Sequence, residues 1–181
     1  MIQNPFLQRQ TWNSFLLSIM VAVSSTCLGG FLAWMEQRHK YYGSRWLHTL
    51  SLLPLAIPSY LIAASLARFT YGPDKILHSG FLPAWFSLVL VTSPYVQLAC
   101  GAALQNVSSS EEEAALLLEK RFFQRFRVSV WPNISSAVVF AMLISFLYAI
   151  SDFGAVATLN LEVLTWSLFK SIRTSDLYSA S

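Results

Sequence analysis

Carboxylates and cationic side chains are the groups best suited to ionic chemistry, and their densest group in this sequence lies in one stretch. The stretch reads SSSEEEAALLLEKRFFQRFRVSVWP and runs from Ser108 to Pro132. Three of its four glutamates come first, at positions 111–113, and its cations follow Glu119 at Lys120, Arg121, Arg125 and Arg127. Anions before cations is the order that a helix macrodipole favours. The order therefore indicates a charged helical element.

The same stretch carries signals for the start and the apolar face of that helix. Two serines each precede a glutamate by three residues, as in a capping box: Ser109 with Glu112, and Ser110 with Glu113. Leu118, Phe122 and Phe126 are spaced by four and share one face. An apolar face must cover its own bundle, the membrane surface or another protein. From physics alone, an interfacial helix and a docking element are both open.

The other residues that could do chemistry are scattered. The three histidines, His39, His48 and His78, lack the spacing of metal ligands, and neither cysteine has a CxxC partner. The tripeptide at 152–154 matches the kinase DFG by letters only, since no glycine-rich phosphate loop accompanies it. The sequence also contains no Walker A pattern. We therefore expect no catalytic residue, no metal site and no cofactor, so this chain is not expected to be an enzyme.

The composition of the whole chain indicates whether it folds in water or in a membrane. Of the 181 residues, 55% are hydrophobic and only 12% are charged, about half the charged share of soluble domains. A soluble domain would need more polar surface than that. The net charge of +3 is small and is not gathered in one arm, so a nucleic-acid partner is not expected. The composition favours a membrane protein.

Four segments are long and apolar enough to cross a bilayer, which takes about 20 residues of helix. They are Ser14–Trp34, Trp46–Leu66, Ala84–Leu104 and Ile134–Ile150. None shows the polar face that a helix of a soluble bundle should have. We predict an all-α fold: a polytopic transmembrane helical bundle of about four spans plus a cytoplasmic helix.

The connections between spans predict the orientation. Met35–Arg45 and Gln105–Trp131 are rich in lysine and arginine, whereas Phe69–Pro83 has only Lys75, balanced by Asp74. The positive-inside rule then places the first and third connections in the cytoplasm and the N-terminus outside. Tryptophans at the span ends fit an aromatic belt.

Several residues inside the spans suggest more than an anchor. Ser18, Ala22, Thr26 and Gly30 recur every four residues, a spacing that permits close helix packing in lipid. Pro54 and Pro58 remove backbone donors, so the second span should kink or break near Leu53–Pro58. Asp152 ends the fourth span and is a candidate pathway residue, although simple placement in headgroup water is equally open.

The polar stretch also resembles a known pattern. Glu113-Ala114-Ala115, followed after a fixed gap by Pro132, resembles the EAA loop of ABC-transporter membrane subunits. That loop forms the coupling helix which docks on the cytoplasmic ATPase, so the resemblance implies that role for residues 105–131. Glu119 stands where the family has a glycine, which permits a sharp turn that glutamate does not. Ser129 and Trp131 depart from the isoleucine and leucine that usually precede the proline.

Other segments extend the resemblance over nearly the whole chain. WNSFLL at 12–17 and LLPLAIP at 52–58 resemble the start and the kink of the permease core. SDFGAV at 151–156 and NLEVLTWSLFKSI at 160–172 resemble the iron(III)-type permeases.

The resemblance implies the pathway-forming subunit of an ABC importer in the bacterial inner (plasma) membrane, with iron(III) as the first expected substrate. Thiamine, polyamine or phosphonate is the alternative. It also implies an ATPase, an extracytoplasmic substrate-binding protein, and a second permease half or homodimer partner, besides membrane lipid. A membrane scaffold or channel subunit that never meets an ATPase is the alternative from a different class.

The organisation expected is a single transmembrane permease domain over 1–181, with the coupling loop at 105–131. Leu161–Ser181 holds Glu162, Lys170, Arg173 and Asp176, too many charges for a further span. Because SDFGAV resembles a segment of the first of two permease halves, we expect the domain to be an incomplete first half.

Overall fold

A computed structural model of the chain describes residues 5–39, 42–71, 80–107, 124, 126–161 and 163–165. All regular secondary structure within these ranges is helical, which confirms the predicted fold class. Most of the polar stretch lies outside the described residues. The predicted capping boxes, Glu113, Ala114, Ala115, Glu119 and Phe122 therefore have no structural description, and neither does most of the segment after Leu161.

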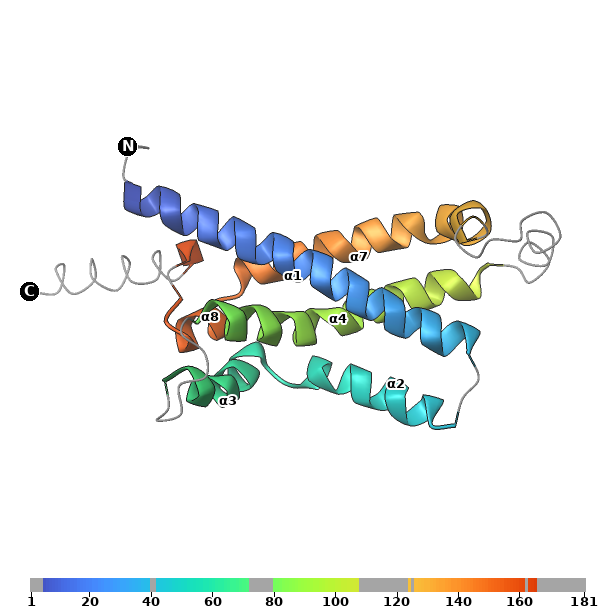
Figure 1. The fold of residues 1–181 in the computed structure, drawn as a ribbon, viewed down its shortest axis with the longest axis horizontal. Coiled ribbons are helices and arrows are strands. Elements are labelled where there is room, and N and C mark those ends of the chain that lie inside the picture. The colour runs from blue at the N-terminus through green and yellow to red at the C-terminus, as the bar shows by residue number, and fades with distance from the viewer. Residues whose placement is uncertain are drawn as a thin grey trace, which may run out of the picture.

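Three long helices form the body of the bundle. They are α1 (Pro5–Arg38), α4 (Phe81–Gln105) and α7 (Trp131–Ser151), the last continuing directly from the π-helical turn η2 (Phe126–Val130). Each is long and apolar enough to cross a membrane. All three pack against one another, and α1 crosses the other two obliquely (Figure 1).

The predicted second span is broken, as the two prolines indicated. It consists of α2 (Ser44–Leu52), the 3₁₀ turn η1 (Leu53–Ala56) and α3 (Ser59–Tyr71). The two halves are bent by 94°. Ile57 is extended, with φ −103° and ψ 122°, because Pro58 disfavours a helical conformation in the residue before it. The described residues therefore contain three helices that are long and apolar enough to cross a membrane, or up to four if the bent pair is one span.

The interface between α1 and α4 is built on small side chains, but not quite those predicted. Ser18 and Ala22 are buried, whereas Gly30 faces open space, because a Cβ placed there would have no atom within 4 Å. Gly29 makes the close approach instead. Four residues advance a helix by about 40° beyond one full turn, so a stripe of strict fours drifts off the interface. The contact face continues through Ser25 to Gly29.

At the end of the bundle where α7 finishes, the chain reverses direction and leads into one more short helix. The short helix α8 (Gly154–Thr158) packs against α3 and the first half of α4. Leu17, Leu88, Val156 and Leu159 are at most 1% exposed in the apolar core there. A second core, at the end where η2 begins, includes Val96, Leu104 and Ile134.

Candidate functional site

The two cation-rich connections adjoin the same end of the bundle, which is the predicted cytoplasmic end. Trp34, near the end of α1, contacts Phe126 at the start of η2, and α4 ends at the same end of the bundle (Figure 1). Trp34 and Phe126 meet edge to face, with ring centroids 5.4 Å apart and planes at 70°. Trp131 lies 6.4 Å from the Phe126 ring, and the Arg38 guanidinium lies 5.9 Å above the Trp34 ring. Phe126 thus fastens the end of the polar stretch to α1.

The backbone between this contact and α7 is a π-helical turn. Ser129 and Val130 are buried within it, and Asn133 donates from Nδ2 to the Ser129 carbonyl at 2.9 Å. Pro132 is exposed in the first turn of α7, and it has no N–H to donate to the carbonyls of the π-helical turn before it. π-turns often occur at functional sites. An apolar cavity of about 620 Å³ opens beside this turn, between α1, α4 and α7.

Asp152 lies at the other end of α7, where it joins three helices. Its Oδ2 accepts a hydrogen bond from the Ser59 hydroxyl of α3 at 2.6 Å, and its Oδ1 accepts from the Ala155 N–H of α8 at 2.8 Å. The contact is close, since a Cβ added to Gly154 would lie 3.1 Å from Tyr60 Cβ. Both carboxylate oxygens therefore hold helices together. A part for Asp152 in the pathway stays a prediction.

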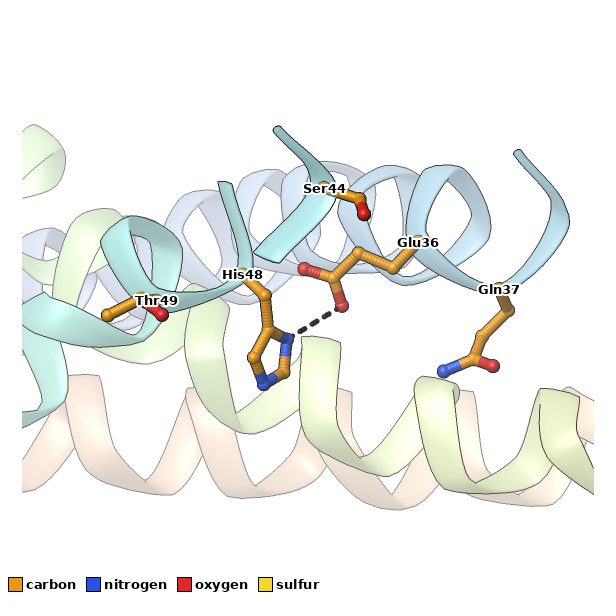
Figure 2. A pocket seen from close by; sticks show the side chains of 5 residues that line it. All are labelled: Glu36, Gln37, Ser44, His48 and Thr49. Carbon is orange, nitrogen blue, oxygen red and sulfur yellow. Dashed lines mark hydrogen bonds and ion pairs between the residues drawn. The ribbon is translucent and has the colours of Figure 1, made fainter. Parts of the chain in front are cut away.

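A polar cluster near the predicted cytoplasmic end was missed at the level of sequence. Gln97 of α4 is 2% exposed and donates from Nε2 to Glu36 Oε1 at 2.6 Å and to Ser51 Oγ at 2.8 Å. His48 Nδ1 lies 3.0 Å from Glu36 Oε2 (Figure 2), and the nitrogen is the donor because a carboxylate only accepts. A glutamine inside an apolar span and a glutamate just beyond another were the available signals.

The polar cluster borders an open cavity of about 450 Å³, lined by Glu36, Gln37, Ser44, His48 and Thr49 (Figure 2). Within the described ranges, no three His, Cys, Asp or Glu side chains lie close enough together to hold a metal ion. What this geometry can do is join helices: the cluster connects α1, α2 and α4, as Asp152 connects α3, α7 and α8.

Known proteins resemble the chain along most of its length. It is 25% identical over 166 residues to the Fe(3+)-transport system permease protein FbpB 2 of Haemophilus influenzae, an alignment that covers 90% of this chain and 31% of that protein. It is 28% identical over 171 residues to the sulfate transport system permease protein CysW of Escherichia coli K12, covering 88% of this chain and 58% of that one. The chain thus spans less than two thirds of either relative.

Its fold also has a counterpart among solved structures. The crystal structure of an amino acid ABC transporter with histidines superposes with a TM-score of 0.69, covering 96% of this chain and 80% of that one, at 17% identity. That likeness supports the fold alone.

Residues 25–180 match the family described as binding-protein-dependent transport system inner membrane component. The relatives named above are transport permeases and not enzymes. The chain therefore belongs to this family, the membrane-spanning permeases of ABC transporters, and is a multi-pass protein of the inner membrane.

Proposed function

We propose that this chain forms part of the substrate pathway of an ABC importer and receives movement from a cytoplasmic ATPase through Glu113–Pro132. The family match over residues 25–180 is the observation that carries the proposal. The contact between Phe126 and Trp34 supports it, because a force applied to the polar stretch would reach α1 and α7 together. The mechanism is mechanical, and no residue of the chain has a catalytic role.

The proposed partners follow from the same role. An ATPase would bind at Glu113–Pro132, an extracytoplasmic binding protein would deliver the substrate at the end that holds Asp152, and a second permease half or second copy would complete the pathway. Lipid would cover apolar side chains such as Phe140 and Leu147, each 61% exposed.

Co-purification tests the ATPase contact. The tagged chain, expressed in its own host, should retain an ATPase, and Phe126→Ser should lose it because the polar stretch is no longer fastened to α1. Phe140→Ser is the matched control, since Phe140 is an exposed phenylalanine of α7 away from this end. Equal recovery of the ATPase by all three proteins, each present in the membrane, would contradict the proposal.

For the substrate we propose iron(III) first, and sulfate is the second candidate. SDFGAV supports iron(III), and so does the similarity to FbpB 2, whereas the similarity to CysW supports sulfate. Iron(III) is a cation and sulfate is an anion, so an excess of the unlabelled substrate should block uptake and an excess of the other ion should not. Uptake that is blocked by excess sulfate and not by excess iron(III) would reject the first candidate.

A further inference from the structure

The helix α2 is attached to the bundle in an unusual way. Among its described side chains none is buried, and Trp46 and Leu50 are 75% and 60% exposed. Helices that lack buried apolar contacts open at low free-energy cost. What fixes α2 to α1 and α4 is the polar cluster of Glu36, His48, Ser51 and Gln97, here called the Glu36 clamp.

The half-helix after the break is attached differently. In α3, Ala63 is fully buried and Ser59 is 7% exposed, and the Ser59 hydroxyl donates to Asp152. Apolar packing against α8 and α4 adds to this attachment. The two halves of the broken span therefore differ: α3 belongs to the packed core, and α2 is held by hydrogen bonds.

The segment between them has the properties of a pivot. Leu53–Pro58 contains two prolines, which interrupt the helical ladder, and the extended Ile57 lies between the 3₁₀ turn and α3. A few residues at the ends of elements are enough to absorb a hinge rotation.

Glu36 is the centre of the clamp because its two oxygens bind two different elements. Oε1 accepts from Gln97 of α4, and Oε2 accepts from His48 of α2. Gln97 in turn donates to Ser51 of α2, so the carboxylate and the amide hold α2 at two points one turn apart. Charge-assisted hydrogen bonds of this kind are among the stronger ones.

We propose that Glu36 is a positioning residue that clamps α2 onto α1 and α4, and that α2 swings about Leu53–Pro58 when the clamp opens while α3 stays in place. The proposal goes beyond the transport function and does not depend on it, because the motion belongs to this chain alone. A failed search for the ATPase would leave it standing.

Distances between spin labels test the proposal in the full chain, reconstituted in lipid nanodiscs. One pair joins Leu50→Cys of α2 to Phe86→Cys of α4, and a reference pair joins Leu61→Cys of α3 to the same Phe86→Cys. All three sites are exposed, and both native cysteines are replaced by serine. The variants are Glu36→Ala, the conservative Glu36→Gln, and Gln37→Ala as the matched control that lines the same cavity.

In Glu36→Ala the Leu50–Phe86 pair should show a second, longer distance, which corresponds to α2 swung away from α4. The fraction of molecules with this distance should rise about tenfold, because a lost hydrogen bond to a charged group shifts an equilibrium on that scale. The Leu61–Phe86 pair should not change. Glu36→Gln should restore most of the closed population, because its side-chain oxygen can accept from Gln97 while its NH2 group donates to His48 Nδ1 of α2. Gln37→Ala should match the wild type. Unchanged Leu50–Phe86 distances in Glu36→Ala would overturn the proposal. Equal changes in both pairs would overturn it too, since Glu36 would then hold the whole fold together.

Discussion

Replacing Gly29 by alanine should separate α1 from α4, whereas the same change at Gly30 should not. A Cβ at Gly29 would overlap the Ser93 carbonyl oxygen and lie 2.7 Å from Val96 Cβ and 2.9 Å from the Gln97 nitrogen. Two of these three neighbours are backbone atoms, which cannot rotate away. Carbon atoms pack at about 3.5–4.0 Å, so the helices must part by about 1 Å.

The magnitude follows from comparing the two glycines. Alanine favours a helix over glycine by about 1 kcal/mol, and this gain is common to both positions. Overpacking costs about 1–3 kcal/mol and acts only at Gly29. The free energy of unfolding of Gly29→Ala should therefore be lower than that of Gly30→Ala by about that amount. At about 2–4 °C per kcal/mol for chains of this size, several degrees of Tm should separate them.

The protein supplies its own probe for the assay. Cys100 is 2% exposed in the core beside this interface, so a thiol-reactive dye should label it only on unfolding. Cys27 is exposed and is replaced by serine to remove background. The labelling midpoint on heating in detergent gives the Tm of each variant. If Gly29→Ala unfolds at or above the temperature of Gly30→Ala, the reasoning about this interface is refuted.

Two further predictions concern the ends of the bundle. Asp152→Ala should lose about 1–2 kcal/mol of stability, because it removes the hydrogen bond to the start of α8. Asp152→Asn can keep both contacts, so it should reduce uptake without lowering the Tm. Wild-type uptake in Asp152→Asn would mean that Asp152 only joins helices. Glu119→Gly restores the glycine that the family has at this turn, so it should raise the substrate-stimulated ATPase activity of the transporter. Unchanged or lower ATPase activity would mean that the loop is adapted to glutamate.

The sequence predicted the long elements because the bilayer imposes a simple length rule. The spans at Ser14–Trp34 and Ile134–Ile150 were correct, yet α1 runs from Pro5 to Arg38. Hydropathy detects the part of a helix within hydrocarbon and not its ends in water. The break at Pro54 and Pro58 was predictable because proline acts on its own backbone, whatever surrounds it.

The site was harder to predict because its bonds join distant parts of the chain. Asp152 and Ser59 are 93 residues apart, and Gln97 and Glu36 are 61 apart. Each was visible as a polar residue near a span end, but its partner depends on how the helices pack. Whether Gly29 or Gly30 faces α4 depends on the rotation of α1 about its own axis, and a strict spacing of four residues predicts that rotation wrongly.

The measurement that tests the central claim most directly is uptake of labelled iron(III) and sulfate by the host organism. It should be compared in three strains: the wild type, one lacking the gene, and one with the gene restored, each before and after depletion of cellular ATP. The account predicts that deletion abolishes ATP-dependent uptake of one of the two ions, iron(III) first, and that the restored gene returns it. ATP-dependent uptake of both ions at wild-type rates in the deletion strain would contradict it.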